Sequence, residues 1–229
     1  IRSGSASGGR RSNGMTVQSN YTWSRCIGDF VTNIVGGPAG RNYMFPNNRR
    51  ADRANCVTDV RHSFNASTVW ETPQFSNPTL RILAGNWQLS GIVRAQSGTY
   101  LSVLTGVDIA LTAQQDQRGS QVLANPYPDS QSIDRWINPV AFGQPASGTY
   151  GNLGRNTILG PGSIRIDVGL TRTFRVRENQ SIQFRAEAFN LPNHVNPDNP
   201  NTAVNNRNFG RILSAADPRI VQLALKYVF

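Results

Sequence analysis

The chain has 229 residues, of which 38% are hydrophobic and 16% are charged. Its formal net charge of +10 comes almost wholly from arginine, because Lys226 is the only lysine. The arginines are scattered and no recognition helix, zinc-finger spacing or ribonucleoprotein motif accompanies them, so we expect no nucleic-acid partner. No apolar run approaches the roughly 18 residues of a transmembrane helix. The remaining composition, rich in Ser, Thr, Asn, Gln and Gly, suits strands with one apolar and one uncharged polar face.

The chain opens on residues 1–13, whose Gly/Ser/Arg-rich composition predicts a loop. A chain that begins inside a loop, with no signal peptide, is expected to be a fragment of a longer one. Apolar and polar residues then alternate with a period of two, which predicts strands. Six segments show this alternation: 15–23, 61–70, 87–96, 164–171, 182–188 and 221–229.

The connections between these segments alternate in length. Residues 26–60, 106–162 and 191–218 are long connections, whereas 72–86 is shorter and 176–179 is a tight turn. Long loops on one side and short turns on the other are typical of outer-membrane β-barrels. Irregular loops of this length are uncommon in a compact soluble domain.

Periodicity alone does not separate a barrel from a soluble β-sandwich, since both have two-faced strands. Aromatic residues near the strand ends favour the barrel, because they resemble interfacial girdles. These residues are Trp23, Trp70, Trp87, Phe174, Tyr227 and Phe229. Arg172 falls in phase with the apolar residues and counts against the pattern; near the turn, we expect it to reach the lipid head groups.

Four charged residues lie on the polar faces of two adjacent strands: Arg165, Asp167, Arg185 and Glu187. In a barrel this face lines the lumen, so we expect a ladder of ion pairs between neighbouring strands. Direct contact with a substrate is the alternative.

Cys26 and Cys56 lie in one polar interval without metal-ligand spacing, which leaves a loop disulfide or two unpaired thiols. The two histidines, His62 and His194, form no catalytic constellation, and no phosphate loop or nucleophile elbow is present. We therefore expect no enzyme, cofactor or metal; a secreted β-rich hydrolase is the least favoured interpretation.

The last segment keeps its alternation to the final residue, through Leu223, Leu225, Tyr227 and Phe229. This ending resembles the assembly signal of outer-membrane barrels. Longer motifs resemble the Oar-like group of TonB-dependent receptors. They are Phe184–Leu191 with Asn193-His194, Asn208–Ile212, Asp217–Gln222, Asn20–Ser24 and Asn138–Gly143.

The resemblance implies that residues 1–229 are the C-terminal part of an antiparallel transmembrane β-barrel. About six strands would belong to a barrel of about 22, with long extracellular loops and with the plug and N-terminal domain elsewhere. The implied function is uptake of a ligand across the outer membrane of a Gram-negative bacterium. The implied partners are lipid and lipopolysaccharide, the barrel-assembly machinery, and TonB through the missing N-terminal region. The alternative is a secreted or surface β-sandwich or adhesin module.

Overall fold

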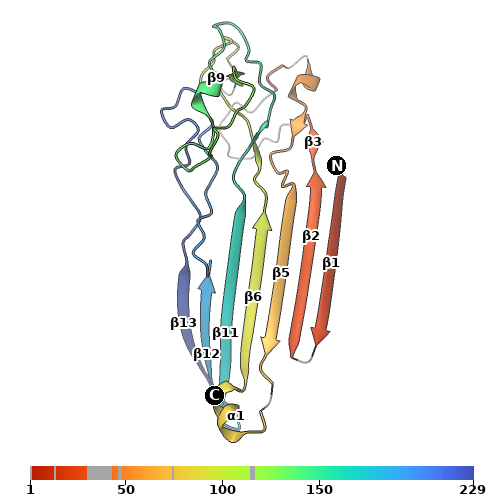
Figure 1. The fold of residues 1–229 in the computed structure, drawn as a ribbon, viewed down its shortest axis with the longest axis vertical. Coiled ribbons are helices and arrows are strands. Elements are labelled where there is room, and N and C mark those ends of the chain that lie inside the picture. The colour runs from red at the N-terminus through yellow and green to blue at the C-terminus, as the bar shows by residue number, and fades with distance from the viewer. Residues whose placement is uncertain (1, 13, 30–42, 46–47, 74, 114–116) are drawn as a thin grey trace.

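One antiparallel sheet of seven strands forms the body of the computed structural model, in the order β1-β2-β5-β6-β11-β12-β13 (Figure 1). The structure describes residues 2–12, 14–29, 43–45, 48–73, 75–113 and 117–229, with the backbone alone for 2–12. Each strand pairs with its predecessor in the sheet, so the sheet is an up-and-down meander. Its strands are β1 (Arg2–Ser12), β2 (Met15–Arg25), β5 (His62–Glu71), β6 (Trp87–Gln96), β11 (Ser163–Arg177), β12 (Gln180–Phe189) and β13 (Ile220–Val228).

Six of these strands are the six that side-chain alternation predicts, so that prediction is confirmed. The prediction of a loop over residues 1–13 is wrong for residues 2–12, which form β1 along the edge of β2. Strand pairing uses backbone hydrogen bonds and does not need alternating side chains. A strand of this Gly/Ser/Arg-rich composition therefore shows no apolar–polar alternation in the sequence. The overlooked signal is the Asn13-Gly14 dipeptide between two extended segments. Ser12 lies opposite Met15 and Gly14 has a φ of +77°, as a two-residue hairpin turn requires.

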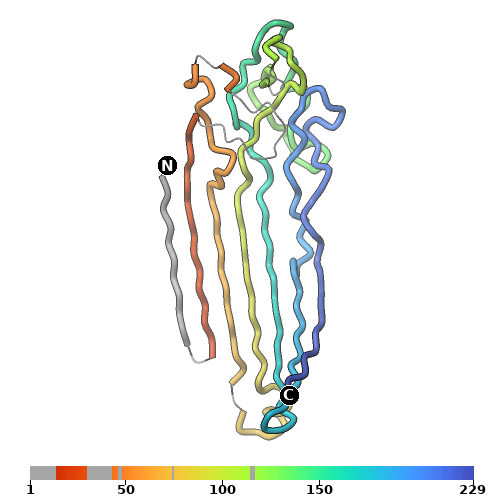
Figure 2. Tube along the Cα trace, turned by 180° about the vertical axis from the view of Figure 1, so that it is seen from behind, coloured from red at the N-terminus to blue at the C-terminus, as the bar shows by residue number. Residues whose placement is uncertain are grey.

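The long and short connections lie at opposite ends of the sheet (Figures 1 and 2). At the short-turn end, residues 178–179 join β11 to β12, and helix α1 (Pro78–Ala84) lies between β5 and β6. Helical 3.6-residue periodicity does not extend over any long window of the sequence, so this short helix was not predicted. No described helix is of a length and hydropathy that would carry it through a bilayer.

The long connections fold together into a body that we term the loop cap, made of the described residues of 26–61, 97–162 and 190–219. A buried apolar cluster holds the cap together: Val103, Ile137, Ala141, Phe142, Leu153, Ile158 and Phe209. Short elements connect its segments: β3 (Ile27–Gly28), η1 (Arg49–Asp52), β4 (Ala54–Asn55), β7 (Tyr100–Leu101), β8 (Ser120–Gln121), η2 (Pro139–Ala141), β9 (Phe142–Gly143) and β10 (Ile158–Leu159). The molecule therefore has its compact core in the cap, at one end of the sheet.

The two edge strands of the sheet, β1 and β13, lie on opposite sides in both ribbon and trace views (Figures 1 and 2). Each is paired on one side only within the described residues. The sheet is therefore open along both edges within the described residues.

Candidate functional site

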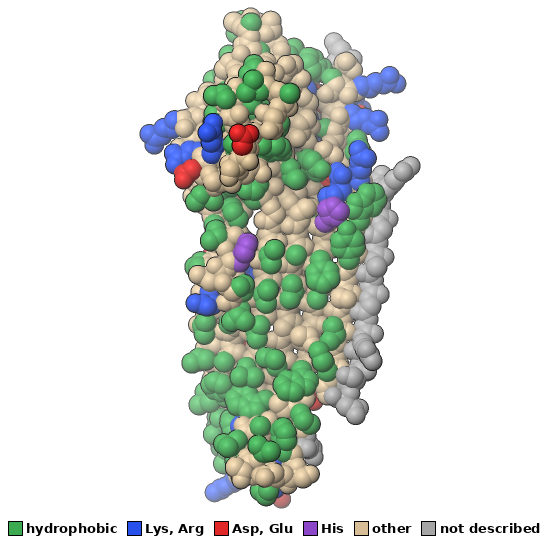
Figure 3. All heavy atoms as spheres, in the orientation of Figure 1, with side chains coloured by type: hydrophobic (Ala, Val, Ile, Leu, Met, Phe, Trp, Pro, Cys, Tyr) green, Lys and Arg blue, Asp and Glu red, His purple; other side chains and the backbone are tan. Residues whose placement is uncertain are grey.

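One face of the sheet is apolar across six strands. The registers align Met15, Trp70, Leu89, Leu170, Ala186 and Leu223 in one row that crosses six of the seven strands, from β2 to β13. Because side chains alternate along each strand, the rows two residues away lie on the same face. Figure 3 shows this face covered with hydrophobic side chains from the short turns up to the loop cap.

No second layer covers this face in the described part of the chain. Leu223 and Leu225 of β13 are 69% and 73% exposed, and Trp70, Phe174 and Ile164 are also exposed. A contiguous apolar surface of this extent is a contact surface rather than ordinary solvent-facing protein.

Aromatic residues border the apolar face at both ends, as the sequence predicts. Trp23 lies near the loop cap, opposite His62, whose Nδ1 is 2.7 Å from the hydroxyl oxygen of Tyr21. Trp87 and Phe174 lie near the short turns, with Phe174 in the row of Ile182 and Tyr227. Aromatic rings with polar tips are typical of the two levels at which a membrane meets water.

Arg172 interrupts this apolar pattern, and the expectation that it reaches the lipid head groups stays a prediction. Its guanidinium is buried and donates hydrogen bonds to the carbonyl oxygens of Ile82 and Leu83 at the end of α1. It also lies over the rings of Trp87 and Phe174, 5.1 and 4.6 Å from their centroids. Arg172 thus satisfies helix carbonyls that have no partner within the helix.

The opposite face of the sheet is polar and carries the four predicted charged residues. Arg165 Nε is 3.0 Å from Asp167 Oδ1, and Arg185 Nη1 is 3.7 Å from Glu187 Oε1. The expected ladder between neighbouring strands is wrong, because the register places Arg185 opposite Thr171 and Glu187 opposite Gly169. Each ion pair instead joins residues two apart on one strand, while Glu187 accepts a hydrogen bond from Gln222 across the strands.

The terminal residues predicted as an assembly signal lie on the exposed edge strand. Leu223, Leu225 and Tyr227 project from one face of β13, in register with β12. Phe229 is 90% exposed and stacks on Tyr227 at a centroid distance of 5.9 Å. These side chains therefore remain accessible in the folded chain.

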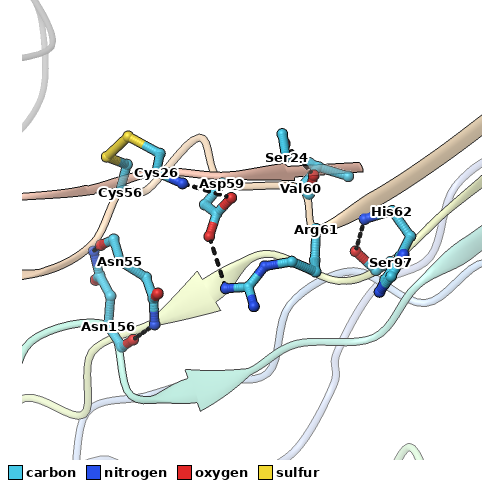
Figure 4. A network of polar contacts seen from close by, with 10 residues as sticks. All are labelled: Ser24, Cys26, Asn55, Cys56, Asp59, Val60, Arg61, His62, Ser97 and Asn156. Atoms are coloured by element: carbon cyan, nitrogen blue, oxygen red, sulfur yellow. Dashed lines mark hydrogen bonds and ion pairs between the residues drawn. A yellow bond between two sulfur atoms is a disulfide. The ribbon is translucent and has the colours of Figure 1, made fainter. Parts of the chain in front are cut away.

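At the base of the cap, Cys26 and Cys56, the two cysteines expected to pair, form a disulfide (Figure 4). The buried carboxylate of Asp59 accepts from the backbone N–H of Cys26 at 3.2 Å and pairs with Arg61 at 3.2 Å. Asn156 donates to the carbonyl of Asn55 at 2.6 Å and so joins a distant loop to the same network.

Two further ionisable groups of the cap were not singled out by sequence. Hydrogen bonds from the backbone N–H groups of Thr112 and Ala113 hold the pKa of Asp108 below its ordinary value. Burial lowers the pKa of the Arg155 guanidinium, which donates to the carbonyl of Gly28 at 3.3 Å. Such groups fix loop conformation; the described residues contain no cluster of three side chains suited to a metal ion.

A comparison with known families gives a match to the outer membrane beta barrel domain over residues 3–222. Neither a curated protein nor a solved structure matches the chain significantly. The matched range includes the loop cap and all of the sheet except the first residue of β1 and residues 223–228 of β13. With its two-faced sheet and aromatic borders, this chain belongs to the outer membrane β-barrel domain family and is a component of the outer membrane.

Proposed function

We propose that the chain is a C-terminal section of the barrel of a TonB-dependent transporter in the outer membrane of a Gram-negative bacterium. The observation that carries this proposal is the uncovered apolar face, which continues in register across β2, β5, β6, β11, β12 and β13. In a bilayer this face contacts lipid and the polar face lines the lumen. The loop cap then lies outside the cell, where it meets lipopolysaccharide.

The openness of the sheet supports a large barrel. A barrel of about eight strands closes tightly around its own side chains. Here the seven strands leave the sheet open, with β1 and β13 on opposite sides (Figure 2). An open sheet edge is not tolerated in lipid, so further strands of the intact protein complete the wall. A wall of about 22 strands surrounds a lumen wide enough for a plug and a passing ligand.

The assignment to TonB-dependent transport rests on the motifs that resemble Oar-like receptors. Two of them take defined places in the fold: Phe184–Leu191 includes most of β12, and Asn138–Gly143 spans the turn from η2 into β9 in the cap. The intact transporter would take up its ligand with energy from TonB, which contacts a region outside this chain.

A secreted or surface β-sandwich, the other interpretation of the alternating strands, requires a second sheet against the apolar face. Within the described residues the remaining sheets are two-stranded and belong to the loop cap. Leu223 and Leu225 stay exposed, which does not favour a sandwich.

The test uses the intact protein in cells and in detergent. We expect it to fractionate with the outer membrane, to migrate faster before heating than after, and to cross-link to TonB in living cells. Recovery as a soluble species without detergent would refute the membrane assignment. A folded outer-membrane protein that does not cross-link to TonB refutes the transporter type and leaves the barrel assignment in place.

A further inference from the structure

Helix α1 exposes three large apolar side chains at the short-turn end of the sheet. Leu80, Ile82 and Leu83 are 48%, 68% and 66% exposed. With 100° between successive residues, Leu80 and Leu83 share one side of the helix and Arg81 lies on another. A helix of seven residues is too short to be stable alone in water, so the surrounding contacts must select it.

Both ends of α1 are fixed by side chains. At its start, the Asn77 side chain accepts from the backbone N–H groups of Thr79 and Leu80 at 2.9 and 3.3 Å. At its end, Trp87 Nε1 and Arg172 Nη1 each donate to the carbonyl of Leu83 at 3.0 Å. These contacts hold the helix in a defined position while its three apolar side chains stay exposed.

The residues that hold α1 also define where it lies. Trp87 and Arg172 face each other in register between β6 and β11, on the apolar face of the sheet. They belong to the aromatic border at the short-turn end, which is the level of the periplasmic membrane–water boundary. Apolar side chains of the sheet and of the short-turn end lie on the same side of the molecule (Figure 3).

We propose that α1 is a membrane-surface anchor that lies in the periplasmic leaflet at the boundary between head groups and acyl chains. Leu80, Ile82 and Leu83 insert among the acyl chains, and Arg81 lies beside the phosphate groups of phospholipids. The occupant is lipid rather than protein because the surface continues the lipid-facing wall. This inference rests on the proposed function, in which that wall contacts the bilayer.

In this arrangement Arg172 is a positioning residue. A single charged side chain on a lipid-facing strand is costly near the middle of a bilayer and less costly near its surface. Arg172 lies near the surface, between two aromatic rings, and uses its charge to anchor the helix end. The break in the apolar pattern is thereby explained as the attachment point of α1.

The test places a nitroxide label on the intact protein, reconstituted in vesicles of phosphatidylethanolamine and phosphatidylglycerol. Ile82→Cys reports on α1, Leu170→Cys on the apolar face and Thr171→Cys on the polar face. Collision with oxygen, which concentrates in lipid, is compared with collision with a water-soluble nickel chelate. We expect the label at residue 82 to favour oxygen by several-fold relative to the label at residue 171.

The labels separate the two possible failures. A water-exposed label at residue 82 beside a lipid-exposed label at residue 170 overturns the anchor and retains the barrel; this is also the result if α1 docks a protein instead. Water exposure at residue 170 overturns the proposed function itself.

The positioning role of Arg172 has its own test. Arg172→Gln should increase the mobility of the label at residue 82 and lower its oxygen collision rate, whereas Arg175→Gln on the polar face should do neither. Equal behaviour of the two variants overturns the positioning role.

Discussion

Arg118 and Asp52, 66 residues apart in the chain, form an ion pair that is almost wholly buried in the loop cap. Arg118 also donates from Nε to the carbonyl of Leu153 at 2.8 Å and lies 5.9 Å from the centroid of the Phe45 ring. One side chain thus joins two of the long connections, 26–61 and 97–162. The ordered structure of the cap depends on this contact as well as on its apolar cluster.

Arg118→Met should destabilise the cap by about 3–5 kcal/mol, because it leaves the Asp52 carboxylate buried without its partner. The measurement is hydrogen exchange of the cap amides in the intact protein, with heat-modifiable migration as the check that the barrel remains folded. Arg49→Met is the matched control: its pair with Asp29 is exposed and should contribute less than about 1 kcal/mol. The double variant Arg118→Met/Asp52→Asn should recover part of the loss; a double variant less stable than the single one contradicts this explanation.

The disulfide between Cys26 and Cys56 closes a loop with a sequence separation of 30. Loop-closure entropy for a loop of this length is worth about 3–4 kcal/mol. Replacing both cysteines by serine should lower the opening free energy of the neighbouring backbone by that order. The amide of Cys56 donates a hydrogen bond to the carbonyl of Cys26. Its hydrogen-exchange rate, compared with that of residue 56 in the double variant, measures the change in opening free energy. Protection of the β5 amides is the internal reference. If protection at residue 56 is unchanged in the double variant, the disulfide does not stabilise this part of the cap.

The membrane sheet was predictable from sequence because each strand must satisfy two different surroundings with alternate side chains. The sequence shows this constraint as an alternation of apolar and polar residues along β6 and β11. It is absent from β1, whose small and basic residues leave only the Asn13-Gly14 turn as a signal.

Contacts between segments far apart in the chain were not predictable. Arg165, Asp167, Arg185 and Glu187 were correctly grouped on a polar face. Which residues face them on the neighbouring strand depends on a register that no local pattern specifies, and that register leaves the ion pairs within each strand. The pairing of Arg118 with Asp52 depends on how two long loops fold together. The short helix α1 has an Asn77-Pro78 start signal, yet its stability comes from Arg172, 90 residues away from Ile82.

A charge on the apolar face of the sheet should impair assembly, whereas the same charge on the polar face should not. Leu170 and Thr171 are neighbours on β11 and project from opposite faces, in the rows of Leu89 and Gln88. Leu170→Lys should cost about 1–2 kcal/mol, because residue 170 lies two residues from the boundary level of Arg172, and the cost of a lysine falls from about 2–4 kcal/mol at the bilayer midplane to about 0–1 kcal/mol near its surface. Unfolding of the reconstituted protein measures this cost. Thr171→Lys should change stability little; similar losses for both variants would show that the two faces do not meet different media.

Phe229 should matter for assembly in cells and hardly at all for the stability of the folded barrel. It is 90% exposed, so Phe229→Ala removes little buried apolar area. We expect less than about 1 kcal/mol of change in protein refolded into detergent, together with a several-fold lower amount in the outer membrane. Val221→Ala, an exposed change on β13, is the control and should assemble normally. Equal assembly of the two variants refutes recognition of the terminal residue.

The turn around Asp108 should lose order as the pH falls. The carboxylate accepts hydrogen bonds from the backbone N–H of Thr112 at 3.0 Å, the N–H of Ala113 at 2.7 Å and the Gln117 side chain at 2.6 Å. These donors favour the charged form, so the pKa of Asp108 in the folded protein is below its ordinary value. The stabilisation is fully present above the ordinary aspartate pKa of about 3.9 and is lost as the pH falls through the lowered value.

Hydrogen exchange at the amides of Thr112 and Ala113, corrected for intrinsic rates, measures this loss between about pH 5 and about pH 2. Protection should fall over that interval in the native protein. Asp108→Asn, which is uncharged throughout, should show weaker protection with no such fall, and Asp129→Asn should behave as the native chain. Protection that is independent of pH in the native protein would show that the hydrogen bonds to Asp108 do not hold the turn, because protonation must weaken a bond in which the acceptor charge takes part.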